Sequence, residues 1–194
     1  MKPSSSEKLE RNVIQEGLCI GCGACIGLCP YFQSYRGKTA LLFPCNVEAG
    51  RCLAHCPKAE VDVEGLSQFH FAKPYDGSPL GAWRSIHVSR AGGRVKKQPF
   101  QSGGTVSAMM YFALRTRRID GAILTDRDGI LPEPRLVTRP AAVFRQSLSK
   151  YTAAPTLEAM NRAVTAGYGA LGVVATPCQA MSLARMRMNP LAKP

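Results

Sequence analysis

The segment that decides the fold is Cys19-Ile20-Gly21-Cys22-Gly23-Ala24-Cys25-Ile26-Gly27-Leu28-Cys29-Pro30. Its four cysteines are separated by two, two and three residues, and a proline follows the last of them. This is the spacing of the bacterial [4Fe–4S] motif, in which the fourth cysteine ligates a second cluster. The glycines permit the backbone torsions that so tight a loop requires. Structural zinc, the alternative, usually takes cysteine pairs that a longer spacer separates, so we expect iron and sulfide here.

A second group of cysteines, Cys45-x6-Cys52-x3-Cys56-Pro57, has an irregular spacing. A regular motif would have cysteines where Asn46 and Ala49 stand. Under crossed ligation, cluster 1 is bound by the first three cysteines of the first motif and the last cysteine of the second. Cluster 2 is bound by the last cysteine of the first motif and the earlier cysteines of the second. The predicted ligands are Cys19, Cys22, Cys25 and Cys56 for cluster 1, and Cys29, Cys45 and Cys52 for cluster 2.

Cluster 2 is thus expected to have only three cysteine ligands, Cys29, Cys45 and Cys52. That set suits a [3Fe–4S] cluster, or a [4Fe–4S] cluster with a fourth ligand that is not cysteine. A single cluster with spare thiols is the alternative. His55 lies between Cys52 and Cys56, but a ferredoxin loop does not need it. We expect an ordinary surface or hydrogen-bonded histidine at this position.

The composition narrows the class of protein. Of the 194 residues, 45% are hydrophobic and 20% are charged, with a formal net charge of +12. Seven of the eight cysteines lie between Cys19 and Cys56, which in a reducing compartment points to metal or redox chemistry rather than to disulfides. No apolar run approaches the ~20 residues that cross a bilayer, and the polar opening lacks the apolar run of a signal peptide. We therefore expect a soluble cytoplasmic protein without a membrane span.

The chain divides into four expected parts. Residues 1–16 are predicted to be a flexible tail, 17–65 an α+β ferredoxin-like [4Fe–4S] module, 66–82 a linker, and 83–194 an α/β domain. In that domain alternating strands and helices favour a mostly parallel sheet. Strands are expected at 86–88, 119–125, 136–138 and 170–175, and helices at 105–118, 140–148, 156–166 and 177–188.

Two loops of the α/β domain have the composition of ligand-binding loops. Gln101-Ser102-Gly103-Gly104-Thr105 opens one helix, and Thr176-Pro177-Cys178-Gln179 follows an apolar strand and opens another. Ligands of open α/β sheets bind beyond the carboxyl ends of strands, often against helix N-termini. Ordinary turn and capping chemistry is the alternative for each loop taken alone.

The positive charge is unevenly distributed. Between Gly77 and Ile119 there is no acidic residue, and the arginines and lysines are Arg84, Arg90, Arg94, Lys96, Lys97, Arg115, Arg117 and Arg118. This basic belt suits a dinucleotide pyrophosphate or another anionic cofactor, and a solvated basic face is the alternative. No recognition motif with interleaved aromatics is present, so we expect no nucleic-acid partner; a zinc-stabilised nucleic-acid binder would require zinc in place of iron.

Taken together, these residues resemble the family of coenzyme F420 hydrogenase/dehydrogenase beta subunits. That family also includes beta-type subunits of formate dehydrogenases and the 7-hydroxymethyl chlorophyll a reductases. The resemblance extends from about residue 17 to the end of the chain. It rests on the cysteines from Cys19 to Cys56, the two loops, Ile119-Asp120-Gly121-Ala122, Ser149-Lys150-Tyr151 and Gly172-Val173-Val174-Ala175, in the family's usual order.

The resemblance implies an iron–sulfur flavoprotein oxidoreductase subunit that moves electrons between [4Fe–4S] clusters and FAD. The flavin would exchange a hydride with a soluble carrier such as coenzyme F420. The implied partners are other oxidoreductase subunits, of a hydrogenase or a formate dehydrogenase, and a carrier, coenzyme F420 or ferredoxin. Implied contacts to flavin or substrate are Ser102, Gly103, Gly104, Thr105, Ser149, Lys150, Tyr151, Thr176, Cys178 and Gln179.

Within that set, Lys150 is a suitable cation for a phosphate or a reduced flavin ring, and Cys178 is either a polar contact or a small buried residue. The alternative function is a ferredoxin-like electron relay without its own flavin that docks on a partner oxidoreductase. The chain departs from the family in two respects. Its second cysteine group is irregular, and it stops soon after Gln179, so we expect the α/β domain to be incomplete at its C-terminus.

Overall fold

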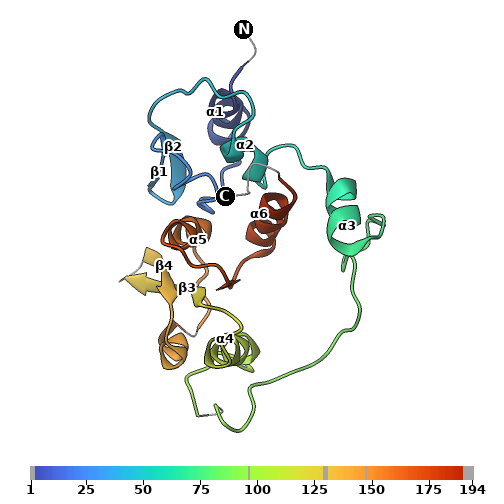
Figure 1. Cartoon of the computed structure of the whole chain (residues 1–194), viewed down its shortest axis with the longest axis vertical. Coiled ribbons are helices and arrows are strands. Elements are labelled where there is room, and N and C mark those ends of the chain that lie inside the picture. The colour runs from blue at the N-terminus through green and yellow to red at the C-terminus, as the bar shows by residue number, and fades with distance from the viewer. Residues whose placement is uncertain (1–2, 96, 129–130, 147, 190–194) are drawn as a thin grey trace.

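The structure is a computed structural model that describes residues 3–95, 97–128, 131–146 and 148–189. A cysteine-rich N-terminal module packs against a small sheet with helices, and an irregular segment joins the two parts by way of α3 (Figure 1). The module contains α1 (Ser5–Leu9), the π-helical η1 (Glu10–Gln15), β1 (Phe32–Tyr35), β2 (Lys38–Leu41), α2 (Arg51–His55) and α3 (Val63–Phe71). The second part contains α4 (Thr105–Arg115), β3 (Gly121–Asp128), β4 (Leu131–Val137), the 3₁₀ helix η2 (Pro140–Gln146), α5 (Thr156–Thr165), β5 (Leu171–Val173) and α6 (Pro177–Met188).

The N-terminal segment differs from the expected flexible tail. A capping box begins α1: the Ser4 hydroxyl accepts the Glu7 N–H at 3.3 Å, and the Glu7 carboxylate accepts the Ser4 N–H at 2.7 Å. Leu9 and Val13 are each 2% exposed and belong to the core of the module. Apolar burial therefore holds α1 and η1 against the cysteine loops, and the spacing Ser4-x-x-Glu7 is itself a signal for a helix start.

The motif loop and the helices of the second part share a core. Cys22 and Ala24 pack with Leu157 and Met186, and the Leu157 N–H donates to the Cys22 carbonyl at 2.9 Å. Gly23 has a φ of +79°, and a Cβ there would lie 2.7 Å from the Glu158 nitrogen. Only glycine therefore allows the motif loop to approach the start of α5 so closely.

The sheet is mixed, which corrects the expectation of a mostly parallel one. Its order is β4-β3-β5; β3 pairs antiparallel with β4 and parallel with β5. In the register, Ile123 lies opposite both Leu136 and Val173. Only residues 129 and 130 separate β3 from β4 in the sequence, and so short a connection joins antiparallel strands alone.

Two further expectations differ from the structure. Residues 86–88 form no strand, and Ile86 and Val88 are exposed. The expected linker begins inside α3, which Asp62 caps by accepting the Gly65 N–H at 2.8 Å. The expected helices at 105–118, 156–166 and 177–188 are confirmed as α4, α5 and α6 to within three residues at each end. Within the described part of the chain, no helix is both long and apolar enough to span a bilayer.

Candidate cofactor sites

The cysteines of the N-terminal module form two groups. The four-cysteine group lines one small cavity beside Leu9, Val13 and Thr39, and consists of Cys19, Cys22, Cys25 and Cys56. The three-cysteine group consists of Cys29, Cys45 and Cys52; burial and then the charges of Cys45 and Cys29 raise the pKa of Cys52 to about 11. The two groups match the ligand sets predicted for clusters 1 and 2, while ligation itself stays a prediction.

The four-cysteine group fits an iron–sulfur cluster by the chemistry of its donors. Burial raises the pKa of Cys22 to about 11 and holds the pKa of Cys25 far above the usual thiol range. Such thiols stay protonated near neutral pH unless a metal charge stabilises the thiolate, so they suit bound iron better than free nucleophilic chemistry. Among the described residues, no group of three or more His, Cys, Asp or Glu is arranged to hold a metal ion; the thiols surround the cavity instead.

His55 is neither a surface residue nor a hydrogen-bonded one, so that expectation is wrong. The side chain is 3% exposed, and neither ring nitrogen has a hydrogen-bond partner. Burial, with the nearby charges of Arg51 and Arg185, lowers the pKa of the imidazole to about 4. The Ser182 hydroxyl of α6 donates to the His55 carbonyl at 2.7 Å, which fixes the backbone of α2 at this point.

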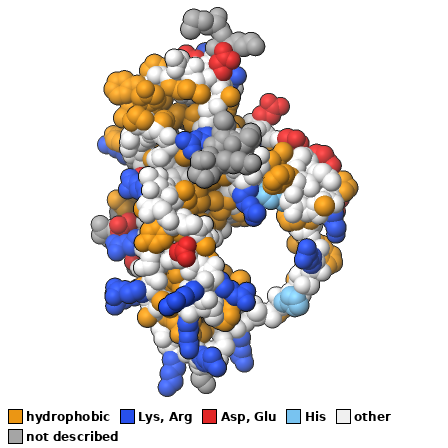
Figure 2. All heavy atoms as spheres, in the orientation of Figure 1, with side chains coloured by type: hydrophobic (Ala, Val, Ile, Leu, Met, Phe, Trp, Pro, Cys, Tyr) orange, Lys and Arg blue, Asp and Glu red, His pale blue; other side chains and the backbone are white. Residues whose placement is uncertain are grey.

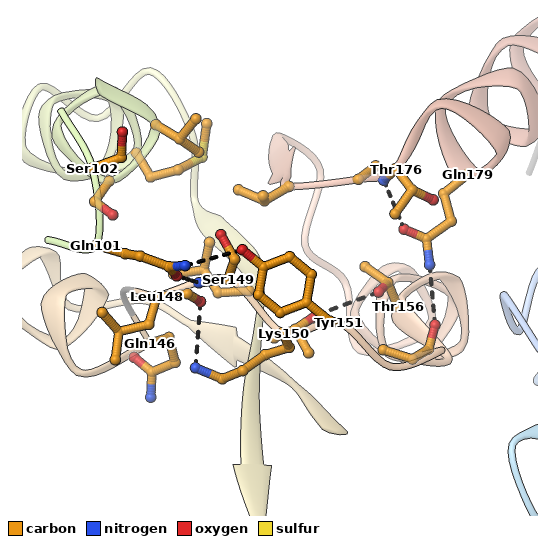
Figure 3. Close-up of a pocket in the computed structure, with 18 of the residues that line it drawn as sticks. Gln101, Ser102, Gln146, Leu148, Ser149, Lys150, Tyr151, Thr156, Thr176 and Gln179 are labelled. Atoms are coloured by element: carbon orange, nitrogen blue, oxygen red, sulfur yellow. Dashed lines mark hydrogen bonds between the residues drawn. The ribbon is translucent and has the colours of Figure 1, made fainter. Parts of the chain in front are cut away.

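A cavity of about 810 Å³ lies where the loops before α4 and α6 meet the segment between η2 and α5 (Figure 3). This volume is in the range of small-molecule and cofactor pockets. Its apolar lining includes Met110, Leu124 and Val174. All of the flavin or substrate contacts implied by the resemblance line this cavity: Ser102, Gly103, Gly104, Thr105, Ser149, Lys150, Tyr151, Thr176, Cys178 and Gln179.

Gly104 shapes one side of the cavity. Its φ is +73°, and a Cβ at this position would lie 2.5 Å from the Phe100 ring, so a side chain cannot be accommodated where the chain turns into α4. The first turn of α4 contains no acidic residue, which leaves the partial positive charge of the helix N-terminus available to an anion.

Gln101 joins two of the loops that line the cavity. Its side-chain amide donates to the Tyr151 hydroxyl at 3.0 Å, and its side-chain oxygen accepts the Ser149 N–H at 2.7 Å (Figure 3). The Lys150 ammonium donates to the Leu148 carbonyl at 3.3 Å. Gln101 is not among the expected contacts; its place in the glycine-rich loop is the signal that could have identified it.

The loop before α6 is held by a second capping box. The Thr176 N–H donates to the Gln179 side-chain oxygen at 3.0 Å, and the Gln179 amide nitrogen donates to the Ala154 carbonyl at 3.0 Å. The Cys178 thiol lies 3.1 Å from the Thr176 hydroxyl. Gln179 is buried and its amide is engaged in these contacts, so its part is to hold the cavity wall in place.

The basic belt does not line the cavity. Its described members are exposed, and Figure 2 shows many Lys and Arg side chains gathered around the end of the molecule that carries α4. Arg115 and Arg118 lie over the rings of Tyr111 and Phe112 at 6.0 and 5.8 Å. A solvated basic face accounts for these residues, and Lys96 lies outside the described part of the chain. Among the described Lys and Arg residues, Lys150 alone lines the cavity.

The two sites are neighbours. Ile20, which stands between Cys19 and Cys22, lines both the cavity of the four-cysteine group and the larger cavity. The fold therefore places a predicted cluster site directly against a cofactor-sized pocket.

Two family models match parts of the chain, and the iron–sulfur model supports a cluster in the N-terminal module. Residues 92–161 match the family model described as "Coenzyme F420 hydrogenase/dehydrogenase, beta subunit N-term", and residues 12–32 match a 4Fe-4S binding domain. A ferredoxin of Pyrobaculum islandicum is 34% identical over 40% of this chain and 70% of its own length.

Longer relatives cover nearly the whole chain. A coenzyme F420-dependent sulfite reductase of Methanocaldococcus jannaschii is 25% identical over 92% of this chain and 26% of its own length. A subunit of the F(420)H(2) dehydrogenase of Methanosarcina mazei is 28% identical over 91% of this chain and 51% of its own length. The chain thus spans between about a quarter and about half the length of these relatives. Over residues 92–161 the chain therefore matches the N-terminal part of the coenzyme F420 hydrogenase/dehydrogenase beta subunits, and the relatives that cover most of the chain are oxidoreductases or their subunits.

Proposed function

We propose that the chain is an iron–sulfur flavoprotein subunit that moves electrons between [4Fe–4S] clusters and FAD and exchanges a hydride with a carrier such as coenzyme F420. The observation that carries the proposal is the meeting of the two sites. Residues from three separate loops, implied by family resemblance to contact flavin, line one cavity, and Ile20 puts that cavity next to the four-cysteine group.

The residues of the cavity would bind different parts of the cofactor. The N-terminus of α4 and the loop that contains Ser102 and Gly103 would hold the anionic part of FAD through backbone N–H groups. Lys150 would face a phosphate or the reduced ring. Met110, Leu124 and Val174 line the cavity with apolar side chains, which would exclude water from a bound ring. When bound, FAD supplies hydride chemistry and the clusters supply single-electron transfer.

The partner class follows from the same family. The relatives named as a beta subunit of coenzyme F420 hydrogenase and as a subunit of F(420)H(2) dehydrogenase are parts of larger complexes by their names. We therefore propose that this chain receives or delivers electrons through other oxidoreductase subunits. Coenzyme F420 is the proposed soluble carrier, and ferredoxin is the alternative.

The test is anaerobic purification with iron, sulfide and flavin quantified per chain. We expect FAD beside iron and sulfide, and FAD that oxidises reduced coenzyme F420. Iron and sulfide without any flavin, even after incubation with FAD, would favour the ferredoxin-like relay instead. Zinc in place of iron would contradict both.

A variant pair locates the flavin. Gly103→Val adds a side chain at the cavity, where a Cβ would lie 3.3 Å from the Ser89 carbonyl oxygen, and we expect lower FAD occupancy with iron unchanged. Gly93→Val is the matched control, because a Cβ there has no atom within 4 Å and the residue does not line the cavity. Equal FAD occupancy in the two variants would show that the glycine-rich loop does not contact the cofactor.

A further inference from the structure

We propose that Thr39 of β2 raises the reduction potential of the cluster that the four-cysteine group holds, because its hydroxyl donates a hydrogen bond to the sulfur of Cys25. Thr39 acts through Cys25, so it is a positioning residue and not an iron ligand. The inference rests on the proposed function in one respect, since it takes an iron–sulfur cluster as the occupant of this cysteine group. It requires no flavin.

The Thr39 side chain is enclosed with the cysteines. It is 4% exposed and lines the cavity of the four-cysteine group. Its hydroxyl oxygen lies 3.6 Å from the Cys25 Sγ, and it has no other hydrogen-bond partner among the described residues. A buried hydroxyl that is left unpaired costs free energy, so a hydroxyl with a single partner stays directed at that partner.

The direction of this hydrogen bond depends on the state of Cys25. In the free thiol, the S–H of Cys25 donates to the Thr39 oxygen. A cysteine that binds iron is a thiolate without a proton, so the Thr39 hydroxyl then becomes the donor. Burial raises the pKa of Cys25, and the hydrogen bond with Thr39 opposes this effect by lowering it. The hydroxyl therefore stabilises negative charge on this sulfur.

Negative charge on the sulfurs is what reduction increases. Reduction adds one electron to an iron–sulfur cluster and requires no new bond within the protein. A donor directed at a ligand sulfur stabilises the added charge, and hydrogen bonds to sulfur are among the factors that set cluster potentials. Cys25 is itself buried, so water screens this interaction little. We therefore expect the hydroxyl to favour the reduced state.

Two further contacts hold β2 against the motif loop. Gly21 has a φ of +63°, and a Cβ there would clash with the Gly37 carbonyl oxygen in the turn between β1 and β2. The Lys38 ammonium donates to the Cys19 carbonyl at 2.6 Å. Successive side chains of a strand point to opposite faces, so Lys38 is exposed while Thr39 is buried. The backbone of β2 thus fixes the place of the hydroxyl relative to the motif loop.

The experiment is a redox titration of the full chain, reconstituted anaerobically and monitored by electron paramagnetic resonance, with iron measured on the same samples. Cys22→Ser identifies the signal of the four-cysteine group by its loss. Thr39→Val removes the hydroxyl and nearly keeps the shape of the side chain. We expect it to retain iron and to lower the midpoint potential by a tenfold change in the reduction equilibrium, ~59 mV for one electron. Thr39→Ser keeps a hydroxyl and should keep the wild-type potential.

Lys38→Gln separates the hydrogen bond from the general effect of positive charge. Lys38 is exposed, so salt should weaken any effect of its ammonium, whereas the shift in Thr39→Val should persist at high salt. An unchanged potential in Thr39→Val with full iron overturns the proposal. So does a shift that Lys38→Gln reproduces and that salt abolishes.

Thr39→Ala is a second variant without the hydroxyl, and the same fall in potential is expected in it. Loss of iron from both Thr39→Val and Thr39→Ala, with iron kept in Thr39→Ser, would show that the hydroxyl holds the ligand loop instead of raising the potential, and would overturn the proposal. A wild-type chain that takes up no iron overturns the proposed function as well.

Discussion

Cys25 and Cys178 show how far one residue type can differ in role within one chain. Cys25 is 8% exposed in the apolar core of the module, and its thiol contacts the Thr39 hydroxyl at 3.6 Å. Cys178 opens a helix at the wall of the larger cavity. Burial raises the pKa of the first, so only a metal makes it a thiolate at neutral pH.

Cys25→Ser should therefore remove the iron of one cluster, about four irons per chain, together with its visible absorbance. A serine hydroxyl is a poor ligand for iron in place of a thiolate. Cys178→Ser is the matched control and should retain all iron. Iron and absorbance are measured on protein reconstituted anaerobically; full iron in Cys25→Ser would contradict the assignment of this thiol as a ligand.

Lys150 supplies the second prediction at this scale. Among the described residues it is the charged side chain that lines the cavity, and its ammonium donates a hydrogen bond to the Leu148 carbonyl. Lys150→Ala should weaken FAD binding roughly tenfold, which corresponds to about 1.4 kcal/mol, while Lys150→Arg should restore most of it. The dissociation constant is measured by quenching of flavin fluorescence.

Lys97→Ala is the control for Lys150, since Lys97 is an exposed member of the basic belt and does not line the cavity. If Lys97→Ala weakens binding as much as Lys150→Ala, the belt rather than the cavity attracts the cofactor. Raising the salt concentration should then abolish the difference between the wild type and both variants.

At the scale of elements, α5 is the part that positions the motif loop. The Asn161 side-chain amide donates to the carbonyls of Ala24 and Ile26 at 3.2 and 2.7 Å, in a buried site. Two backbone acceptors of the cluster loop thus depend on one side chain that comes more than 130 residues later in the sequence.

Asn161→Ala should lower the free energy of unfolding by about 1–3 kcal/mol, because it leaves buried carbonyls without partners. It should also speed the loss of iron to a chelator, since the loop that carries the ligands loosens. Chemical denaturation and chelator kinetics measure the two effects. Gln98→Ala, an exposed amide outside this contact, should change neither.

The elements that the sequence predicts best are those with a local signal. The cysteine motif, the apolar stretch of β3 and the proline and threonine at the start of α6 are each sufficient to identify their element. The antiparallel pairing of β3 with β4 was missed because the expected strands, 119–125 and 136–138, are shorter than β3 and β4 and hide the two-residue connection between them. The apolar residues near residue 86 predict a strand that does not form, because β-branched residues alone do not create a pairing partner.

In the candidate sites, too, the residues with a local sequence motif were predicted and those that depend on long-range contacts were not. The contacts implied by family motifs gather at one cavity, and the cysteine groups follow the crossed pattern of the spacing. The positions of Gln101, Ile20 and the buried His55 depend on contacts between segments far apart in the chain. Such contacts cannot be predicted from a local sequence pattern.

At the scale of the whole molecule, the module and the sheet are joined through Leu157. This side chain is 0% exposed and packs in one core cluster with Cys22 of the module and Met186 of α6. A shared core predicts that the two parts unfold together, since neither keeps its buried surface without the other. The loss of cluster absorbance and the loss of helical circular dichroism should therefore coincide in denaturant.

Leu157→Ala tests that coupling in full. Truncation of a buried leucine costs about 2–5 kcal/mol, and here it opens a cavity against the motif loop and the start of α5 at once. We expect both midpoints to fall together, with iron and FAD lost in parallel. Leu114→Ala, which removes the same atoms from the separate core of α4, β3 and β4, should lower the helical midpoint with less effect on the iron. Two well-separated transitions in the wild-type chain would show that the module folds by itself and that the contact through Leu157 is not what keeps the cluster beside the cavity.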